Sequence, residues 1–289
     1  MRGGTHDHAG ILRPYLPRLA IEWLAEHPNE AFREIDGTLV FVDISGFTKL
    51  SERLARRGKV GAEELTDTIG VCFQELLAVA YAAGGSLIKF GGDALLLLFR
   101  GNDHAGRGCA AAVGMRATLR RIGNIVTSGG RVRLRMSVGV HTGAFHFFMG
   151  GDDHSELLVT GPAATQTTLM EQTAEAGEII VSPATAKNVP ARWLGATKGR
   201  GVLLRSAAPA GEATVDPIPD EALDPTPAVP VAIREHLLAG ASEPEHRQAS
   251  VMFLRFEGSD EIISAEGPAA LADRLAKLVA LVQKAAAAH

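Results

Sequence analysis

The chain has 289 residues, enough for one large domain or two ordinary ones, and its 46% hydrophobic and 21% charged residues are typical of a soluble globular protein. The net charge of −4 gives no electrostatic reason to expect a nucleic acid partner. The first residues lack the apolar core of a signal peptide, and no run is long enough to span a bilayer, so we expect a cytoplasmic protein that binds no membrane. Cys72 and Cys109 lie in apolar helical patterns, which predicts buried free thiols.

Residues 1–36 are predicted to form a helical lead-in. The stretch "ILRPYLPRLAIEWLAEHP" carries apolar residues at helical spacing after Pro17. Trp23 lies within this helix. We expect its side chain to anchor the lead-in to the domain that follows.

The stretch "VFVDISGFTKL", residues 40–50, joins a predicted buried strand to a predicted helix. The apolar run 39–42 indicates the strand, and the helical pattern begins near Phe47. Asp43 stands where the strand ends. An Asp beside a helix start commonly caps free N–H groups and offsets the positive end of the helix. Taken alone, the residue favours that structural role over a catalytic one.

A second carboxylate follows in a predicted β-hairpin. After a helical pattern over 62–83, the stretch "SLIKFGGDALLLLF" places two apolar runs on either side of a Gly-Gly-Asp turn that carries Asp93. In an antiparallel sheet, a strand that pairs with strand 39–42 can bring this turn beside the end of that strand. The pattern therefore predicts that Asp93 lies near Asp43.

The rest of the first domain alternates predicted helices and strands. Helical patterns cover 105–122 and 162–173, and the second opens on a proline, as helix starts favour. Further short strands are predicted in "RVRLRMSVGVHTG", "AFHFFMGG", "ELLVTG" and "GEIIVS". The order of elements predicts an α+β domain over residues 37–206, with an antiparallel sheet and helices over one face.

A change of composition follows this domain. Six prolines crowd residues 209–230, which predicts an extended connector over residues 207–247. The pattern of the first domain then restarts at residues 248–289, where Phe253 corresponds to Phe41 and Gly258 to Gly46. One strand and two helices cannot bury a core, so we expect the second copy to be truncated and the chain to be part of a longer protein.

Two carboxylates at one sheet edge repel each other unless a cation lies between them. Oxygen ligands suit Mg²⁺ or Mn²⁺, and two such ions are a common device for phosphoryl transfer. Small residues at the strand-to-helix turn allow backbone N–H groups to approach phosphates at the positive end of the helix. The sequence therefore predicts a metal site at Asp43 and Asp93 and a phosphate-binding loop, whose residues are Ser45, Gly46, Phe47 and Thr48.

The motifs "FVDISGFTKLSE", "SLIKFGGDALLLLF", "SVGVHTG" and "GEIIVS", in this order, resemble the catalytic domain of class III nucleotide cyclases. The resemblance implies a ferredoxin-like sheet and conversion of ATP to cyclic AMP and pyrophosphate with two metal ions. It assigns metal binding to Asp43, the Ile44 carbonyl and Asp93, and it makes Lys89 the candidate that reads the adenine ring. The tandem arrangement is similar to that of the soluble adenylyl cyclases.

The chain departs from the family where the second half of a shared active site is expected. Family members supply an Asn and an Arg from the helix that here reads "GPAATQTTLMEQ", in which Thr165 and Leu169 stand at those places. Leu158 stands where a polar base-reading residue is expected, and Arg255 replaces the metal-binding Asp in the second copy. The resemblance therefore implies that this domain holds the metals and that a second cyclase domain is the partner that completes the site.

Two alternatives remain at this stage. A cyclase-like domain without turnover could serve as a regulatory or dimerisation module, although such a module has no need for two converging carboxylates. The chain could also prefer GTP to ATP. A third interpretation starts from "GGDAL", which is similar to the turn of diguanylate cyclases, but Ala94 replaces the acidic residue expected there.

Overall fold

The computed structural model describes residues 5–211, 224–240 and 251–287. It divides the chain into two compact units. The first unit comprises Met1–Ile35, Phe145–Pro162 and Pro217–His289, and the second comprises Asp36–Ala144 and Ala163–Asp216. Two long strands, β1 (Phe32–Ser45) and β6 (Arg135–Gly150), contribute to both units.

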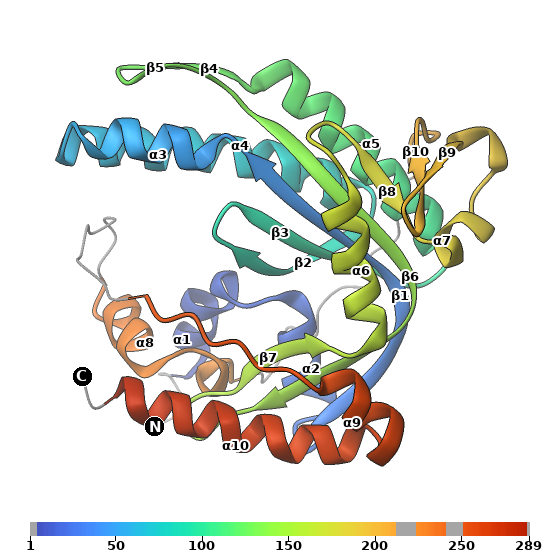
Figure 1. Cartoon of the computed structure of the whole chain (residues 1–289). Helices are drawn as coiled ribbons and strands as arrows, with labels where there is room; N and C mark the ends of the chain where they lie inside the picture. Colours follow the sequence, from blue (N-terminus) through green and yellow to red (C-terminus); the bar gives the residue numbers. More distant parts are fainter. Residues whose placement is uncertain (1–4, 212–223, 241–250, 288–289) are drawn as a thin grey trace. The chain divides into compact units, whose positions relative to one another are not determined.

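The second unit is built on a mainly antiparallel sheet, as the sequence predicts (Figure 1). Its strands follow the order β2-β3-β1-β6-β8-β10-β9, and β6 pairs with β8 in the parallel direction. Antiparallel pairing joins β3 to β1 and to β2. The bounds of the strands not yet given are β2 Gly85–Gly91, β3 Ala94–Phe99, β8 Ile179–Val181, β9 Leu194–Lys198 and β10 Gly201–Leu204.

Alternation along β1 separates the core face of the sheet from the face that carries Asp43. Val40, Val42 and Ile44 are fully buried in the main hydrophobic cluster, while Asp43 points to the opposite face and is half-buried. The cluster is completed by three helices with apolar stripes on one side. These helices are α3 (Phe47–Ala55), α4 (Lys59–Ala82) and α5 (His104–Ile122).

One helix covers the other face of the sheet, whereas the sequence predicts helices over a single face. The helix α6 (Pro162–Thr173) crosses in front of β6 in Figure 1. It approaches closely because Gly139 has no side chain: a Cβ there would lie 2.3 Å from the Glu171 nitrogen and 2.5 Å from the Thr167 oxygen. This contact sets α6, and the residues it carries, on the same face as Asp43.

Several strands differ from the sequence prediction. The runs "SVGVHTG" and "AFHFFMGG" form one continuous strand, β6, which passes through Gly143 without a turn. The predicted strand 39–42 extends from Phe32 to Ser45. The strand β4 (Asn124–Thr127) was not predicted, and neither were β9 and β10; β5 (Gly130–Arg133) covers the start of the predicted strand "RVRLRMSVGVHTG" but is separate from β6. These strands are short, with too few residues to establish a period of two.

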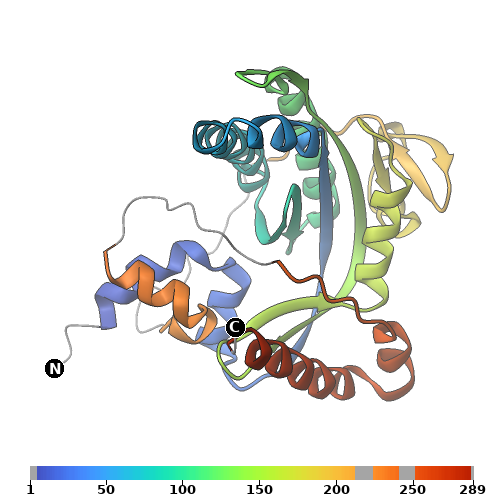
Figure 2. The same cartoon turned by 60° about the vertical axis from the view of Figure 1, so that its left-hand side comes forward.

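The first unit packs helices against the hairpin of β6 and β7. Trp23 is 1% exposed and donates a hydrogen bond from Nε1 to the Glu30 oxygen, 2.9 Å away. Figure 2 shows α10 lying along the β6–β7 hairpin, where Phe148, Leu271 and Leu275 form a separate cluster. The elements of this unit are α1 Thr5–Leu12, α2 Arg18–Glu26, β7 Glu156–Thr160, α8 Val231–Leu238, α9 Ser259–Glu266 and α10 Pro268–Ala286.

The structure of the C-terminal third differs in part from the sequence prediction, which expects an extended connector followed by a strand. Within the described part of the connector, α8 begins after Pro230, and a 3-10 turn precedes it. Residues 251–258 form no strand, although the repeat predicts one there, and Phe253 is 93% exposed. Gly258 adopts a left-handed conformation before α9, as Gly46 does before α3. Residues 212–223 and 241–250 lie outside the described residues.

Both cysteines are buried free thiols, and burial raises the pKa of Cys72 to about 11 and that of Cys109 to about 12. Among the described residues, every helix is too short or too polar to span a bilayer.

Buried hydroxyl groups tie the second unit together across β1, β6 and the short helix α7 (Pro183–Lys187). Thr142 Oγ1 lies 2.8 Å from Thr38 Oγ1 and accepts a hydrogen bond from Thr185 Oγ1 at 3.1 Å. The Thr38 hydroxyl also lies 2.8 Å from His104 Nδ1. All three threonines are less than 9% exposed, so their hydroxyl groups depend on one another for hydrogen bonds.

Replacing the central hydroxyl should destabilise this unit. Thr142→Val keeps the shape but leaves two buried hydroxyl groups short of a partner, so we expect a loss of about 1–3 kcal/mol in the free energy of unfolding, measured by urea denaturation. Thr66→Val is the control, since Thr66 is exposed on α4, and it should change stability by no more than about 0.5 kcal/mol. Equal losses in the two variants would contradict the role of the network.

Candidate functional site

The pairing of β1 with β3 brings the two predicted carboxylates together. Asp43 is paired with Ala94 across the ladder, so Asp93 lies one residue beyond that register position. The backbone N–H of Ile44 donates a hydrogen bond to the backbone carbonyl oxygen of Asp93 at 3.2 Å. The turn itself is two residues long, and Gly92 adopts a φ of +69° that favours glycine. The predicted juxtaposition of Asp43 and Asp93 is present in the fold.

The surroundings of Asp43 make its ionisation unfavourable. The pKa of Asp43 is raised, first by its burial and then by repulsion from Asp93 and from Glu171. Glu171 lies on α6, where its Oε1 accepts a hydrogen bond from Ser137 Oγ at 2.7 Å. Three acidic groups therefore act on one small region, and an arrangement of this kind is stabilised by a bound cation.

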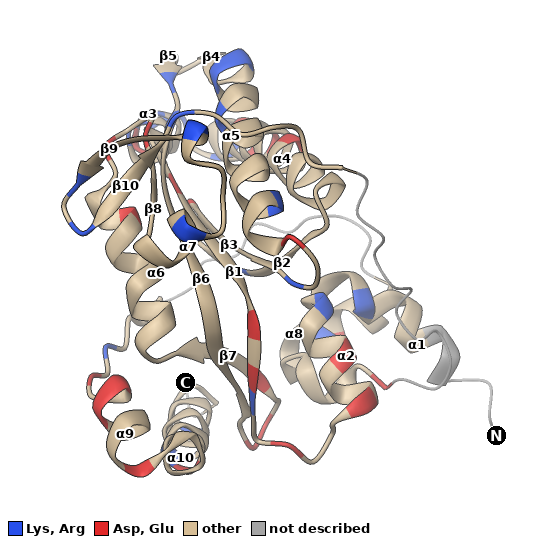
Figure 3. Cartoon of the chain, turned by 90° about the vertical axis from the view of Figure 1, so that its right-hand side faces the viewer, with Lys and Arg blue, Asp and Glu red and all other residues tan. Residues whose placement is uncertain are grey.

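The two aspartates line a cleft of about 610 Å³, which we call the Asp43 cleft. Its other walls are strongly basic, with five Lys and Arg side chains against two carboxylates. Figure 3 shows this basic character on the β4–β5 hairpin at the top of the view. A cleft with a carboxylate pair at one end and a basic wall at the other suits a metal-bound anion. The lining residues are Asp43, Ser45, Gly46, Thr48, Lys49, Arg53, Asp93, Arg131, Val132, Arg133 and Arg135.

The strand-to-helix turn opens into the Asp43 cleft. Gly46 has a φ of +108°, and a Cβ there would lie 3.2 Å from the Arg133 oxygen, so both conformation and space require glycine. Gly46 is the N-cap of α3, and no side chain caps this helix end. Asp43 is therefore not a helix cap, and the backbone N–H groups of the first turn remain able to bind an anion. Phe47 is 3% exposed and packs in the core instead of lining the cleft.

The remaining predicted site residues lie apart from this cleft or lack polar groups. Lys89 is exposed on β2 and is not among the cleft residues. On α6, Thr165 is exposed and Leu169 is half-buried. In the first unit, Leu158 packs with the Phe148 cluster, and Arg255 Nη2 forms an exposed ion pair with Glu257 Oε1 at 2.6 Å.

Other residues of the site were missed by the sequence analysis. Glu171 reaches Asp43 only through the close packing of α6 on Gly139, which no local pattern reveals. Arg131, Arg133 and Arg135 recur at alternate positions of "RVRLRMSVGV", and the alternation was interpreted as a half-exposed strand. This spacing places three arginines on one side of an extended segment, and that pattern could have indicated an anion site.

The donor set fits a divalent cation with incomplete protein coordination. Within the described ranges, no three His, Cys, Asp or Glu side chains come together to hold a metal. Asp43 and Asp93 offer two carboxylates, and the residue that follows Asp43, Ile44, adds a backbone carbonyl. Mg²⁺ commonly takes one or two carboxylates and completes its shell with water and phosphate oxygens, so this set suits it.

Comparison with known proteins identifies the domain. Residues 30–198 match the family described as the adenylate and guanylate cyclase catalytic domain. Human adenylate cyclase type 10 is 30% identical over 162 residues, which are 54% of this chain, and the rabbit protein is 29% identical over 58% of it. The chain spans only about a tenth of the length of these curated relatives.

Solved structures share the fold. The guanylyl cyclase Cya2 is 25% identical, with a TM-score of 0.51 over 64% of this chain and 98% of that one. A bacterial light-regulated adenylyl cyclase has a TM-score of 0.55 over 73% of this chain and 63% of its own, at 16% identity. Both nucleotide specificities therefore occur on this fold.

The raised pKa of Asp43 should make stability depend on pH. A carboxyl group whose pKa is raised by folding stabilises the folded state at low pH, and that stabilisation is lost as the pH rises through its folded pKa. In EDTA, Asp43→Asn should therefore gain Tm relative to the parent chain as the pH rises above about 4, near the usual pKa of an Asp side chain. Asp67→Asn, on the exposed surface of α4, is the control and should follow the parent curve. Parallel melting curves for Asp43→Asn and the parent would contradict the assignment.

Proposed function

The chain belongs to the adenylate and guanylate cyclase catalytic domain family, and we propose that its second unit is the metal-binding half of a nucleotide cyclase that converts ATP to 3′,5′-cyclic AMP and pyrophosphate. The observation that carries this proposal is the pair Asp43 and Asp93 in a cleft with basic walls. In the reaction the ribose 3′-oxygen bonds to the α-phosphorus, the bond from that phosphorus to the bridging oxygen breaks, and the hydroxyl proton is released. The adenine preference rests on the curated relatives, which are adenylate cyclases.

In this proposal Asp43, Asp93 and the Ile44 carbonyl hold two Mg²⁺ or Mn²⁺ ions. Such ions, when bound, lower the pKa of a hydroxyl nucleophile and offset the charge that develops on phosphate oxygens. The chain's own groups bind and orient the triphosphate. Backbone N–H groups of residues 45–48 face it at the positive end of α3, and the arginines of the wall neutralise its negative charge.

In this proposal the unit lacks two catalytic groups that family members supply. Thr165 and Leu169 hold the positions from which family members supply an Asn and an Arg, and neither can neutralise charge on a transferring phosphoryl group. A second cyclase domain is therefore the proposed partner. The same two residues favour the second candidate function, a regulatory module without turnover.

The C-terminal segment supports a second copy that docks on the first. Helices α9 and α10 correspond to α3 and α4, each pair preceded by a left-handed glycine. These helices contact the β6–β7 hairpin through the Phe148 cluster, and Gln283 Oε1 accepts from the backbone N–H of Asp152 at 2.9 Å. We propose that residues 248–289 are the start of this second copy, although residues 251–258 form no strand and Phe253 is exposed.

Restoring the missing pair should create activity. In a Thr165→Asn, Leu169→Arg double variant, two copies of the chain could each supply α6 to the other's cleft. We expect cyclic AMP production to rise by a factor of about 10² or more over the parent chain, measured with ATP and Mn²⁺. Parallel assays with GTP test the base preference. A parent chain as active as the double variant would show that the site uses other residues.

The aspartates should be essential in that active background. Adding Asp43→Ala or Asp93→Ala to the double variant should reduce turnover by a factor of about 10³ or more, because metal binding and charge neutralisation are lost together. Asp67→Ala is the matched control and should keep its activity.

Metal binding can be followed without turnover. At 100 times its Kd, Mn²⁺ should stabilise the parent chain by about 2.7 kcal/mol and leave Asp93→Ala unchanged. Stabilisation of both proteins by the same amount would contradict the site.

A further inference from the structure

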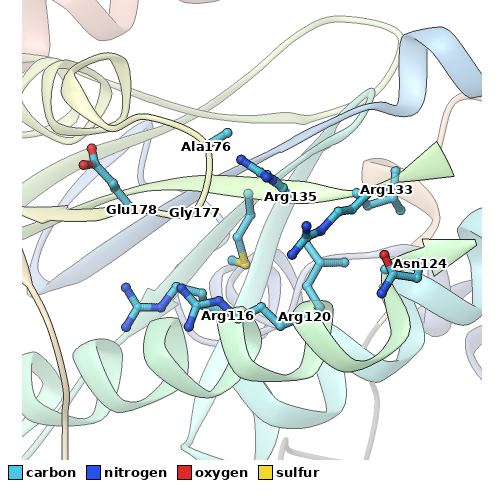
Figure 4. Close-up of a pocket in the computed structure, with 12 residues that line it drawn as sticks. Arg116, Arg120, Asn124, Arg133, Arg135, Ala176, Gly177 and Glu178 are labelled. Carbon is cyan, nitrogen blue, oxygen red and sulfur yellow. The ribbon is translucent and has the colours of Figure 1, made fainter.

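A second basic cavity lies at the edge of the sheet, between α5 and the strands β5 and β6. It has a volume of about 390 Å³, and we call it the α5 pocket. Four arginines line it. In Figure 4, Arg116 and Arg120 reach from α5, while Arg133 and Arg135 come from the strands opposite, and the four side chains surround one hollow.

The positive charge in this pocket is not offset by the protein. In the part of the chain that the structure describes, none of the four guanidinium groups forms an ion pair with a carboxylate. Arg116 and Arg120 are four residues apart on one helix, where like charges are destabilising. Burial and repulsion from Arg120 lower the pKa of Arg116, whose Nη2 donates to the Arg205 oxygen at 2.9 Å.

The single acidic residue of the pocket is occupied elsewhere. Glu178 Oε2 pairs with Lys198 Nζ at 2.5 Å and accepts a hydrogen bond from the Glu175 N–H at 2.9 Å. These contacts lower the pKa of Glu178, so its side chain stays ionised and remains paired with Lys198. Glu178 therefore does not pair with the arginines of the pocket, although Arg116 uses part of its guanidinium to donate to the backbone oxygens of Leu204 and Arg205.

We propose that the α5 pocket binds a small phosphate-bearing anion of at least two negative charges, without a metal ion. Guanidinium groups bind phosphate oxygens in pairs of parallel hydrogen bonds, and four of them in a concave site select for charge and geometry together. This site is distinct from the Asp43 cleft, although Arg133 and Arg135 line both.

Titration with inorganic pyrophosphate in EDTA, at fixed ionic strength, tests the site by calorimetry. We expect saturable binding by the parent chain. Arg120→Gln should weaken it about tenfold or more, since Arg120 lines only the α5 pocket. Arg121→Gln is the matched control, because the neighbouring Arg121 pairs with Glu75 outside the pocket, and it should bind as the parent does.

A second variant distinguishes binding in the α5 pocket from binding in the Asp43 cleft. Arg53 lines only the Asp43 cleft, so Arg53→Gln should leave pyrophosphate binding unchanged. Equal weakening by Arg53→Gln and Arg120→Gln would overturn the proposal, as would full affinity in Arg120→Gln or the absence of saturable binding by the parent chain. The assay contains no divalent metal and measures no turnover, so its failure would leave the proposed cyclase function standing.

Discussion

The pairing of β1 with β3 sets two carboxylates side by side at the end of this strand pair, and the candidate site depends on this juxtaposition. The ladder places Asp43 opposite Ala94, and the Ile44 N–H fixes the Asp93 backbone. A burial-raised pKa at Asp43 shows that the fold tolerates an unfavourable charge there. Proteins accept such costs where a ligand removes them, and a perturbed carboxyl in a cleft is characteristic of functional sites.

The sequence predicted those features that depend on local pattern. The strand before Asp43, the hairpin with Asp93 in its turn and the helix over 162–173 all follow from apolar period and turn residues. The site's other contributors depend on packing between elements that are distant in the chain. Glu171 meets Asp43 because Gly139 admits α6 to the sheet, and the arginines of β5 line the cleft because the β4–β5 hairpin contacts α3.

Helix α6 carries buried residues that fix its packing and exposed residues that do not. Thr167 and Met170 are almost fully buried against the sheet, and the backbone near Thr167 leaves no room for a side chain on Gly139. Thr165 is exposed on the same helix, so a change of its side chain would not disturb the packing of α6 on the sheet. In the proposed pair of cyclase domains, such surface positions of α6 could differ between the two domains without a change of fold.

The shared arginines connect the two cavities of the second unit. Arg133 and Arg135 line both the Asp43 cleft and the α5 pocket, and one guanidinium cannot satisfy an anion in each at the same time. A ligand that engages them on the α5 side would therefore weaken binding of an anion in the cleft. Linkage requires the effect to be reciprocal, so a nucleotide in the cleft would lower the affinity of the α5 pocket by the same factor. Anions in the two cavities would compete for Arg133 and Arg135. An anion in the α5 pocket would therefore reduce nucleotide binding in the Asp43 cleft without entering that cleft.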